Sequence, residues 1–563
     1  MKDGGKLVVE TLEHFGVSRV FCVPGESYLA VLNALCDSDI EATVCRQEGG
    51  AAMMAEAWGK VHSNPGVCMV TRGPGATNAS SGVHVAAQDS TPMLILIGQI
   101  ASTRRHREAF QEVDYQQFFG GMAKWVAEID SADRIQEMVS RGWHVATSGR
   151  PGPVVLVLPE DTLSGSAAPL ALKPWTRHDT APTTAQMQQV ENLLKKAKNP
   201  LLILGGSRWS AASVAAIQQF AERFELPAIC SFRRQTLFDN EHSHYAGDLG
   251  LGVNPDLVKR IEDADLLLVV GARLSEIASQ DYQLIGLPVS RQKLIHVLSG
   301  AEESGKLYQP DVAIQASADS FCSHLEELPT PASFAWHGHA QQAHAEYLDW
   351  SSLSRTVSSG NLMRSVMEHL QSALPADAIL CNGAGNYTGW IQRFWRFRHY
   401  GTQIAPTSGS MGYGLPAAIA AKLAKPDRTV IALAGDGCFQ MTSQELATAV
   451  QADAAIIVLV IDNAMYGTIR MHQEKHFPGR VSATDLRNPD FAAMARACGM
   501  FAATVDEPDA FPGVFSQAME AQTPALIHIK VDPDALTPTL SLNALSQNAG
   551  SQTAGSQTAG SQK

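Results

Sequence analysis

The sequence lacks the features that mark membrane, secreted and nucleic-acid-binding proteins. No run of about 18 uninterrupted apolar residues occurs, so neither a transmembrane helix nor a membrane partner is predicted. The first residues, Met1–Gly5, carry no apolar core of a signal peptide. The formal net charge of −13 argues against a nucleic-acid partner, because surfaces that bind nucleic acid are basic.

Cysteine spacing typical of metal sites is also absent. The nine cysteines form no C-x-x-C pair, and several of them, such as Cys22, Cys68 and Cys381, lie in apolar runs. Scattered cysteines in apolar segments are typical of reduced, buried thiols. We therefore expect a cytoplasmic protein.

The composition indicates a folded α/β protein with several domains. Apolar residues make up 45% and charged residues 18%, and 563 residues exceed what one hydrophobic core can hold. Strand-like and helix-like segments alternate along nearly the whole chain, which is typical of parallel sheets covered by helices. We expect three doubly wound parallel-sheet domains. The predicted strands include Val20–Val23, Gly66–Thr71, Met93–Ile97, Val154–Leu158, Leu201–Leu204, Leu266–Val270, Val430–Leu433 and Ala525–Ile529.

Two breaks divide the chain. The segment Ser164–Pro182 is rich in proline, small and polar residues and is predicted to be a linker, and a second break falls at Leu328–Pro331. Residues 541–563 repeat the pattern A-G-S-Q-T, which cannot bury a core, so we expect a disordered tail. The breaks predict an N-terminal domain at residues 1–165, a central domain at 185–330 and a C-terminal domain at 355–540.

A glycine-flanked acidic residue and a distant asparagine predict a metal–diphosphate site. Asp436 stands between Gly435 and Gly437 just after one strand-like run, and Asn463 follows the next such run. A carboxylate and an amide at the ends of two parallel strands can bind one divalent cation together. Mg²⁺ prefers oxygen ligands and is usually shared with phosphates. The flanking glycines let backbone N–H groups approach a phosphate closely.

This spacing resembles that of the thiamine-diphosphate (ThDP) enzymes. In that family a spacer like residues 438–461 separates Gly-Asp-Gly from an Asn-Asn pair, of which this chain keeps Asn463 and replaces the first Asn by Asp462. The resemblance implies ThDP and Mg²⁺ as cofactors, with Asp436, Asn463 and the carbonyl oxygen of Met465 as metal ligands. Without the resemblance, the pattern also fits a β-α-β crossover with a glycine-rich turn.

A second segment carries the acid that ThDP enzymes need. Arg46-Gln47-Glu48, followed by Gly-Gly-Ala-Ala, resembles the family's R-H-E-x-x-A-A segment, with Gln47 in place of His. The resemblance implies that Glu48 hydrogen-bonds the pyrimidine ring of ThDP and promotes its imino tautomer, while the cofactor supplies the carbanion chemistry. The alternative is an ordinary surface carboxylate at a helix start.

Three further loops resemble ThDP-binding segments. Thr71–Asn78 is similar to T-S-G-P-G-A-T-N, Ser408–Pro416 resembles the segment whose apolar residue, here Met411, wedges between the two rings, and Gly383–Tyr387 aligns with a loop near the diphosphate. Read alone, these segments would be turns or core residues. The resemblance implies a cofactor-binding set of Gly25, Glu48, Gly73, Asn78, Gly385, Asn386, Tyr387, Ser410, Met411, Gly435, Asp436, Gly437, Asn463, Met465, Tyr466 and Gly467.

Within the family, the chain most resembles the acetolactate synthase branch. Ala109–Glu112 matches that branch's A-F-Q-E segment, which implies that Phe110 and Gln111 line the substrate funnel. Lys124 stands where the branch carries an active-site Lys that can balance a 2-oxo acid carboxylate. These three residues join Glu48 as candidate catalytic residues. A loop Gln and an exposed Lys are otherwise ordinary surface residues.

Several positions depart from the biosynthetic members of that branch. Ile277 and His472 stand where those enzymes carry the Arg and Trp that hold the second 2-oxo acid. An apolar side chain cannot make the bidentate carboxylate contact of Arg, so we expect a pocket of different shape. Glu26-Ser27 replaces small apolar residues near the reacting carbon. This polar pair fits a hydroxylated or charged substrate, or a helix cap.

The central segment departs from the flavin-binding forms. Residues 231–236 do not match their glycine-containing loop, and Ile295-His296-Val297-Leu298 lacks the Asp of their I-H-I-D segment. We therefore predict that FAD is not a cofactor. Arg233 and Arg234 either contact an anion such as a nucleotide or a CoA tail, or form an exposed solvated pair, which we expect.

The resemblance implies an enzyme that decarboxylates a 2-oxo acid and joins the remaining acyl group to an aldehyde or ketone. Three alternatives share this chemistry, namely a simple 2-oxo acid decarboxylase, a 2-hydroxy ketone lyase and a 2-hydroxyacyl-CoA lyase. An alternative of another class is a non-catalytic ThDP-fold binding protein. The family's active site lies between subunits, which implies a homodimer or a homotetramer.

Overall fold

The computed structural model describes residues 1–546, and within them lie three six-stranded sheets, which confirm the predicted fold class. The chain forms two compact units, residues 1–347 with 397–408, and residues 348–396 with the part from 409 onward. Each of the eight segments predicted as strands overlaps a strand, and only Val23 and Thr71 lie one residue beyond the end of theirs. No helix of residues 1–546 is long and apolar enough to cross a membrane.

The first sheet of the first unit is parallel and has the strand order β3-β2-β4-β5-β7-β6. Its central strands are buried throughout their length, as expected for a parallel sheet covered on both faces. The strands are β2 (Arg19–Cys22), β3 (Glu41–Val44), β4 (Gly66–Val70), β5 (Met93–Gln99), β6 (Trp125–Glu128) and β7 (Pro153–Pro159), and the helices are α1 (Gly4–His14), α2 (Leu29–Leu35), α3 (Glu48–His62), α4 (Pro74–Asn78), α5 (Ser80–Asp89), α6 (Tyr115–Phe119), α7 (Ile135–Thr147) and α8 (Glu160–Ser164).

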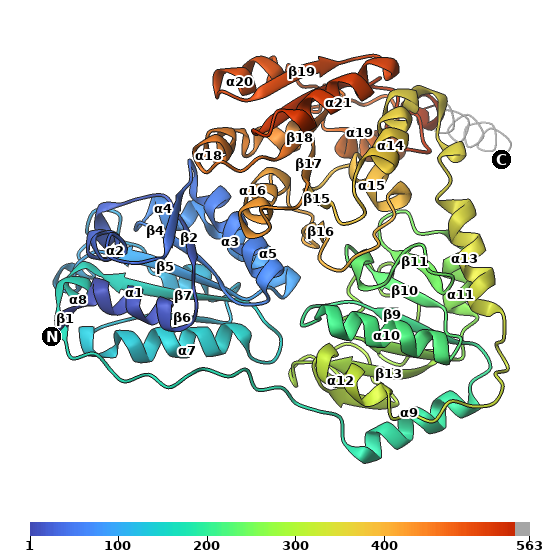
Figure 1. Cartoon of the computed structure of the whole chain (residues 1–563), viewed down its shortest axis with the longest axis horizontal. Helices are drawn as coiled ribbons and strands as arrows, with labels where there is room; N and C mark the ends of the chain where they lie inside the picture. Colours follow the sequence, from blue (N-terminus) through green and yellow to red (C-terminus); the bar gives the residue numbers. More distant parts are fainter. Residues whose placement is uncertain (547–563) are drawn as a thin grey trace, which may run out of the picture. The chain divides into compact units, whose positions relative to one another are not determined.

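Helices cover both faces of this sheet (Figure 1). Apolar residues of α1 and α7 share one core cluster with side chains from β2, β4, β5 and β7. On the opposite face α3 and α5 pack so closely that a Cβ on Gly82 would lie 2.4 Å from the Cβ of Ala52. Glycine at position 82 is therefore required by this close approach, which fixes α3 against α5.

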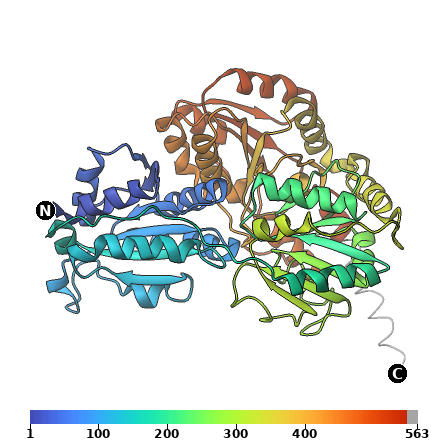
Figure 2. The same ribbon diagram turned by 60° about the horizontal axis from the view of Figure 1, so that its bottom comes forward.

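The central sheet is also parallel, with the order β11-β10-β9-β12-β13-β14. Alternate residues of β9 enter two different core clusters, Leu202 and Leu204 on one face and Leu201 and Ile203 on the other. Figure 2 shows helices on both sides of these strands. The elements are β9 (Pro200–Leu204), β10 (Ala228–Ser231), β11 (Tyr245–Leu249), β12 (Leu266–Val270), β13 (Lys293–Leu298), β14 (Val312–Gln315), α9 (Thr184–Lys196), α10 (Ala211–Arg223), α11 (Pro255–Glu262), α12 (Ala318–Leu325) and α13 (His339–Trp350).

Five of the six strands of the third sheet lie in the second unit and run parallel in the order β15-β17-β18-β20-β19. Helix α16 packs on β15 and β17, while α20 and α21 pack on β19 and β20. The elements are β15 (Ile379–Asn382), β16 (Gln403–Ile404), β17 (Val430–Gly435), β18 (Ile457–Asp462), β19 (Phe501–Val505), β20 (Ala525–Lys530), α14 (Asn361–Ala373), α15 (Thr388–Phe394), α16 (Gly414–Ala424), α17 (Asp436–Gln440), α18 (Leu446–Gln451), α19 (Gly467–His476), α20 (Phe491–Ala497) and α21 (Phe511–Glu520).

The ends of the chain differ in part from the prediction. Two-residue strands β1 (Lys2–Asp3) and β8 (Ser166–Ala167) pair antiparallel, so the predicted linker begins with a short ordered strand. The predicted tail starts too early, because residues 542–546 are helical and the N–H of Leu542 bonds the carbonyl oxygen of Asp534 at 2.9 Å. The rest of the predicted tail, residues 547–563, lies outside the described part of the chain.

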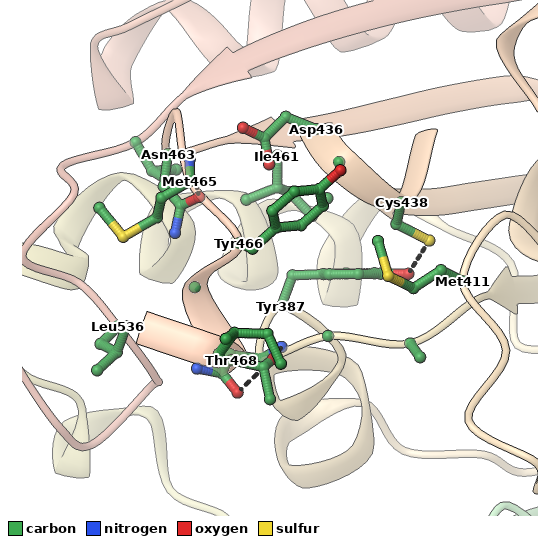
Figure 3. Close-up of a pocket in the computed structure, with 18 of the residues that line it drawn as sticks. Tyr387, Met411, Asp436, Cys438, Ile461, Asn463, Met465, Tyr466, Thr468 and Leu536 are labelled. Atoms are coloured by element: carbon green, nitrogen blue, oxygen red, sulfur yellow. Dashed lines mark hydrogen bonds between the residues drawn. The ribbon is translucent and has the colours of Figure 1, made fainter. Parts of the chain in front are cut away.

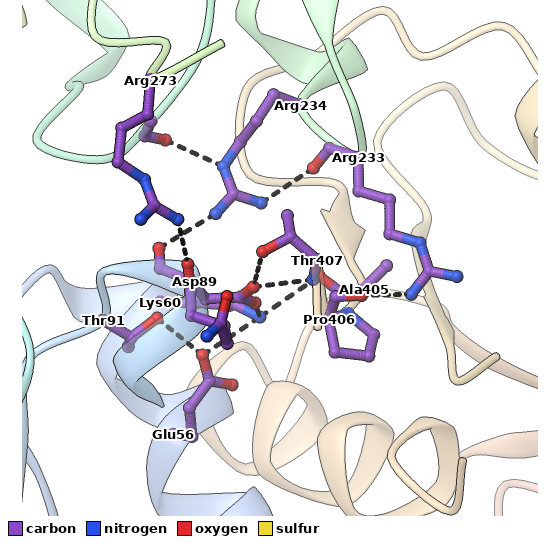
Figure 4. Close-up of polar contacts among 12 residues, drawn as sticks. Glu56, Lys60, Asp89, Thr91, Arg233, Arg234, Arg273, Ala405, Pro406 and Thr407 are labelled. Carbon is purple, nitrogen blue, oxygen red and sulfur yellow. Dashed lines mark hydrogen bonds and ion pairs between the residues drawn. The ribbon is translucent and has the colours of Figure 1, made fainter. Parts of the chain in front are cut away.

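A buried group of charges fixes the body of helix α3 in the first unit (Figure 4). Lys60 lies 3.1 Å from the carboxylate of Glu56 and also pairs with Asp89, and both carboxylates are fully buried. Asp89 in turn accepts a hydrogen bond at 2.7 Å from the backbone N–H of Thr407. The hydroxyl of Thr91 donates to Glu56 at 2.6 Å. The single ammonium group thus lies between two carboxylates that are removed from water.

Three arginines bind the carboxyl end of helix α5 beside this group. Arg150 donates to the carbonyl oxygen of Ala87 at 2.6 Å, Arg273 to that of Gln88 at 2.7 Å, and Arg234 to that of Asp89 at 3.2 Å. The last carbonyls of a helix have no partner within it and carry partial negative charge, so guanidinium groups stabilise them.

The prediction that Arg233 and Arg234 form an exposed, solvated pair is therefore wrong. Arg233 is only 3% exposed and donates to the carbonyl oxygen of Pro406. Arg234 also donates to the carbonyl oxygen of Gly206 at 2.8 Å. Both guanidinium groups bind backbone oxygens from distant segments, which a linear sequence does not place beside them.

The buried charge group generates a stability prediction. Lys60→Met leaves two buried carboxylates without their shared cation, so we expect the free energy of unfolding to fall by about 3 kcal/mol or more. The control is Lys195→Met, which removes a half-exposed helix pair with Glu191 and should cost less than about 1 kcal/mol. Denaturant unfolding followed by circular dichroism measures both, and equal small losses would contradict the assignment.

Candidate functional site

The ends of β17 and β18 bring the predicted metal ligands together in the second unit. β17 ends at Gly435 and Asp436 opens α17, while Asn463 follows the last residue of β18. The two strands are adjacent and parallel, with Gly435 opposite Ile461 in the register. Side chains that follow these residues therefore meet at the same edge of the sheet, where open parallel sheets bind ligands.

A pocket of about 250 Å³ opens at this edge (Figure 3). Figure 3 shows Asp436 and Asn463 on one side of the pocket and Cys438 and Met411 on another. Apart from Ser410, all predicted site residues of the C-terminal segment line it. They are Gly385, Asn386, Tyr387, Met411, Gly435, Asp436, Gly437, Asn463, Met465, Tyr466 and Gly467.

Glycines shape this pocket where two tyrosine rings lie against the backbone. A Cβ on Gly435 would lie 3.0 Å from the ring of Tyr387, and a Cβ on Gly437 would lie 2.6 Å from the ring of Tyr466. Any side chain at these positions would push a ring into the pocket. Glycine at positions 435 and 437 therefore keeps side chains out of the turn, which lets a diphosphate approach the backbone closely.

The donor atoms at the end of β18 suit a hard cation. Ala464 has φ of +55°, a conformation that is uncommon for a residue with a side chain and often found at functional sites. It lies between Asn463, whose Oδ1 accepts the N–H of Met465 at 3.3 Å, and Met465 itself. Together with the carboxylate of Asp436, the amide and carbonyl oxygens form an all-oxygen donor set, which fits Mg²⁺.

The electrostatics of Asp436 also favour a cation. Asp436 is 2% exposed, and burial raises the pKa of its carboxyl group to about 6. The neighbouring carboxylate of Asp462 adds to this rise, while hydrogen bonds from Asn488 and Gly437 oppose it. A divalent cation would offset the cost of keeping this buried carboxylate charged.

The loop that carries Met411 is held against α17 and the residues that follow this helix. The N–H of Gly412 donates to the sulfur of Cys438 at 3.2 Å, and the hydroxyl of Thr442 donates to the carbonyl oxygen of Gly412 at 2.7 Å. The hydroxyl of Tyr387 accepts the N–H of Gly383 at 3.0 Å and lies 3.3 Å from the same sulfur. These contacts fix the position of Met411 at the pocket wall.

Several lining residues were missed by the sequence analysis. Thr468 binds Asn386 twice, since its hydroxyl accepts the backbone N–H at 3.1 Å and donates to Oδ1 at 2.9 Å. The only sign in the sequence that Thr468 lines the pocket is its position directly after Gly467, at the start of α19. Trp390 and Leu536 also line the pocket, and nothing in their local sequence marks them.

The predicted acid lies in the first unit, at the start of helix α3. Glu48 is the first residue of α3, and the side chain of Gln47 caps the helix by accepting the N–H of Gly50 at 3.0 Å. Asn78 donates to Oε2 of Glu48 at 3.0 Å. A Cβ on Gly75 would lie 2.9 Å from Cγ2 of Thr71, so glycine is required where this loop packs beside Glu48.

The loop Thr71–Asn78 and its neighbours form one packed group around Glu48. Gly73, at φ of +61°, donates its N–H to the hydroxyl of Tyr115 at 2.8 Å, and a Cβ on it would lie 2.8 Å from the Cβ of Gln111. A Cβ on Gly25 would lie 2.4 Å from the Cβ of Thr71. The structure thus brings Gly25, Gly73, Asn78 and Gln111 together with Glu48.

Glu26 and Ser27 bind this loop and do not cap a helix. Arg72 donates to Glu26 at 2.5 Å and to Glu160 at 2.7 Å, and Ser27 shares a hydrogen bond of 2.8 Å with Thr71. The short helix that starts at Glu26 has no side-chain cap. Glu26, which departs from the small apolar residue of the acetolactate synthase branch, therefore forms an ion pair with Arg72.

Two predicted substrate residues have different surroundings. Phe110 is 75% exposed on its loop. The ammonium of Lys124 donates to the carbonyl oxygens of Val145 at 2.6 Å and Ser148 at 2.7 Å, at the end of α7. Burial lowers the pKa of Lys124 to about 8. Two of its three N–H donors are thus engaged by backbone.

Three domain families match the chain in the order of its sheets. The Thiamine pyrophosphate enzyme, N-terminal TPP binding domain, matches residues 2–118, the central domain matches residues 187–325, and the C-terminal TPP binding domain matches residues 383–529. The chain therefore belongs to the thiamine pyrophosphate enzymes.

Relatives along almost the whole chain are acetolactate synthases. The acetolactate synthase isozyme 2 large subunit of Escherichia coli (strain K12) is 30% identical over 538 residues, which cover 94% of this chain and 96% of the relative. The acetolactate synthase large subunit of Corynebacterium glutamicum is 30% identical over 553 residues, 94% of this chain and 87% of the relative. The mitochondrial catalytic subunit of Saccharomyces cerevisiae is 27% identical over 558 residues, 94% and 80% of the two chains. The predicted acetolactate synthase branch is confirmed.

The glycine contacts in the pocket generate a second prediction. Gly437→Ala places a methyl group where the ring of Tyr466 now lies, so we expect ThDP to bind at least about tenfold more weakly, a change of roughly 1.4 kcal/mol. The control is Gly513→Ala in α21, where a Cβ has open space. Titration calorimetry checks both variants, and unchanged affinity in Gly437→Ala would contradict the described pocket.

Proposed function

We propose that this enzyme is a Mg²⁺- and ThDP-dependent carboligase that decarboxylates a 2-oxo acid and transfers the acyl group to an aldehyde or ketone. The observation that carries the proposal is the all-oxygen donor set of Asp436, Asn463 and Met465 beside the glycine-shaped pocket. The names of the three relatives described above, which are acetolactate synthases, support the substrate class.

The residues of the pocket bind and orient the cofactor. Asp436, Asn463 and the carbonyl oxygen of Met465 would hold Mg²⁺, and the N–H groups beside Gly435 and Gly437 would bind the diphosphate. Bound ThDP supplies the acceptor for the electron pair that is released when carbon dioxide leaves a 2-oxo acid. Met411 provides an apolar wall that helps exclude water from this step.

Glu48 is the proposed acid that activates the cofactor. Asn78 holds its Oε2, so Oε1 is the oxygen that would hold or move a proton at the aminopyrimidine. This chain has Gln47 where the family usually has His. An amide does not titrate, so the residue at position 47 takes no part in proton transfer. Proton handling near the substrate therefore depends on Glu48.

Substrate selection is proposed to differ from that of biosynthetic acetolactate synthases. Ile277 and His472 replace the expected Arg and Trp, and Arg72 is already paired with two carboxylates. Lys124 has one N–H donor left for a substrate carboxylate. Phe110 and Gln111 remain candidates for the substrate funnel. We propose a homodimer or homotetramer, because the active site of the family that the chain belongs to lies between subunits.

We further propose that FAD is not a cofactor. A pocket of about 20 Å³ lies at the carboxyl ends of β9, β12 and β13, and a space of this size holds roughly one water molecule. Arg273 and Arg150 line it, and Arg150 approaches the carboxylate of Glu303 to 3.4 Å. Ion-paired side chains of the chain itself thus line this end of the central sheet, which supports the proposal.

Product analysis tests the proposed reaction together with the role of Glu48. With Mg²⁺ and ThDP, mass spectrometry should detect a 2-hydroxy ketone from a panel of 2-oxo acids and aldehydes. Glu48→Gln should keep ThDP bound and lower turnover by about 100-fold or more, because a positioned proton-transfer group contributes that much. Glu41→Gln, on an exposed carboxylate of β3, is the matched control and should retain full turnover.

The same panel separates the alternatives. Release of an aldehyde without ligation would indicate a simple decarboxylase, and cleavage of 2-hydroxy ketones or 2-hydroxyacyl-CoA would indicate a lyase. Full turnover in Glu48→Gln would refute the assigned role of that residue. No ThDP-dependent turnover on any substrate would favour the non-catalytic binding protein.

The flavin prediction has a spectroscopic test. Purified protein should show no flavin absorption band in the visible range, because the chain lacks the glycine-containing loop at residues 231–236 and the Asp at position 298 of the flavin-binding forms. Reconstitution with excess FAD followed by gel filtration should leave the spectrum unchanged. A stoichiometric flavin band that survives the column would contradict the proposal.

A further inference from the structure

The loop after β18 is held from behind by the segment 484–488. The N–H of Tyr466 donates to the carbonyl oxygen of Thr484 at 2.8 Å, and the N–H of Leu486 donates to that of Ala464 at 2.8 Å. This main-chain pairing runs along the loop that supplies two of the proposed metal ligands. It delivers the end of the segment to the carboxylates that follow β17 and end β18.

Asn488, the last residue of this segment, bridges those two carboxylates. Its Nδ2 lies 2.7 Å from Oδ2 of Asp436 and 2.8 Å from Oδ1 of Asp462. A charged carboxylate only accepts hydrogen bonds, so the amide must turn its NH₂ group toward both. One nitrogen with two hydrogens can satisfy two acceptors at once, which neither Ser nor Asp can do.

Asp462 is itself fixed, so the bridge has a rigid end. Its Oδ2 lies 2.8 Å from Nε2 of His528, which is 2% exposed on the neighbouring strand β20. Its Oδ1 also accepts the N–H of Ala464 at 2.9 Å. Phe491 packs edge-on against the His528 ring, with 5.0 Å between the ring centres. Both oxygens of Asp462 are therefore held in place.

We propose that Asn488 is a positioning residue for the metal site. Its amide orients the carboxylate of Asp436 through Oδ2, which leaves Oδ1 for the cation, and its two N–H groups offset the repulsion between two like charges. The inference rests on the proposed Mg²⁺ site. It adds a residue that touches neither the metal nor the cofactor pocket, since Asn488 does not line that pocket.

Metal affinity tests this role without reference to turnover. Mn²⁺ replaces Mg²⁺ as the probe, and electron paramagnetic resonance measures free Mn²⁺ at saturating ThDP. Asn488→Ala should weaken Mn²⁺ binding by about ten- to hundredfold, the usual effect of losing a hydrogen bond to a charged group. Asn488→Ser keeps one donor and should give an intermediate value. Asn361→Ala, on the exposed first residue of α14, is the matched control and should bind normally.

A double variant distinguishes positioning from a general structural effect. Asp462→Asn removes one of the two negative charges and adds an amide donor close to Asp436. In that background, Asn488→Ala should weaken Mn²⁺ binding several-fold less than it does in the unaltered chain. A residue that only stabilised the fold would give the same loss in both backgrounds, together with a lower melting temperature of the metal-free protein.

Each outcome decides one claim. Normal Mn²⁺ affinity in both Asn488 variants, or equal losses in the two backgrounds, would overturn the positioning role and leave the Mg²⁺ proposal standing. If the unaltered protein bound no Mn²⁺ in the presence of ThDP, the metal site and the role of Asn488 would fall together. A graded loss from Asn to Ser to Ala, reduced by Asp462→Asn, would support the inference.

Discussion

The structure of the second unit depends on how oxygen donors converge where two parallel strands end. β17 and β18 are adjacent and in register, so Asp436 and Asn463 meet without any long-range adjustment of the backbone. A buried carboxylate at this place is costly to ionise, and the rise in the pKa of Asp436 records that cost. The proposed divalent cation, shared with a diphosphate, would remove that cost, and the glycines beside Asp436 keep side chains out of the turn where the diphosphate would bind.

In each unit, buried polar contacts hold the residues of the proposed site in place. The segment 484–488 pairs with the loop that follows β18. Asn488 and His528 hold the carboxylates of Asp436 and Asp462 in one arrangement. In the first unit, helix α3 carries Glu48 at its start and Glu56 and Lys60 in its body. The charge group around Lys60 therefore fixes the helix that presents the proposed catalytic acid.

Features carried by neighbouring residues could be predicted from the sequence. Val430–Leu433 is buried on both faces, so it appears as an uninterrupted apolar run, and Ala525–Ile529 is interrupted only by His528. The glycines around Asp436 mark the turn directly. The surroundings of Arg233 and Arg234 could not be predicted, because their acceptor carbonyls belong to distant segments. The same holds for Asn488, whose two partners follow other strands. Such contacts appear only once the sheet has assembled.

The most direct measurement is a crystal structure of the protein with ThDP and Mn²⁺, using the anomalous signal of the metal. The account predicts one manganese peak per chain, with Asp436, the side-chain oxygen of Asn463 and the carbonyl oxygen of Met465 each about 2.1 Å away. A peak at another place, or clear ThDP density in the pocket with no metal between these three oxygens, would contradict it.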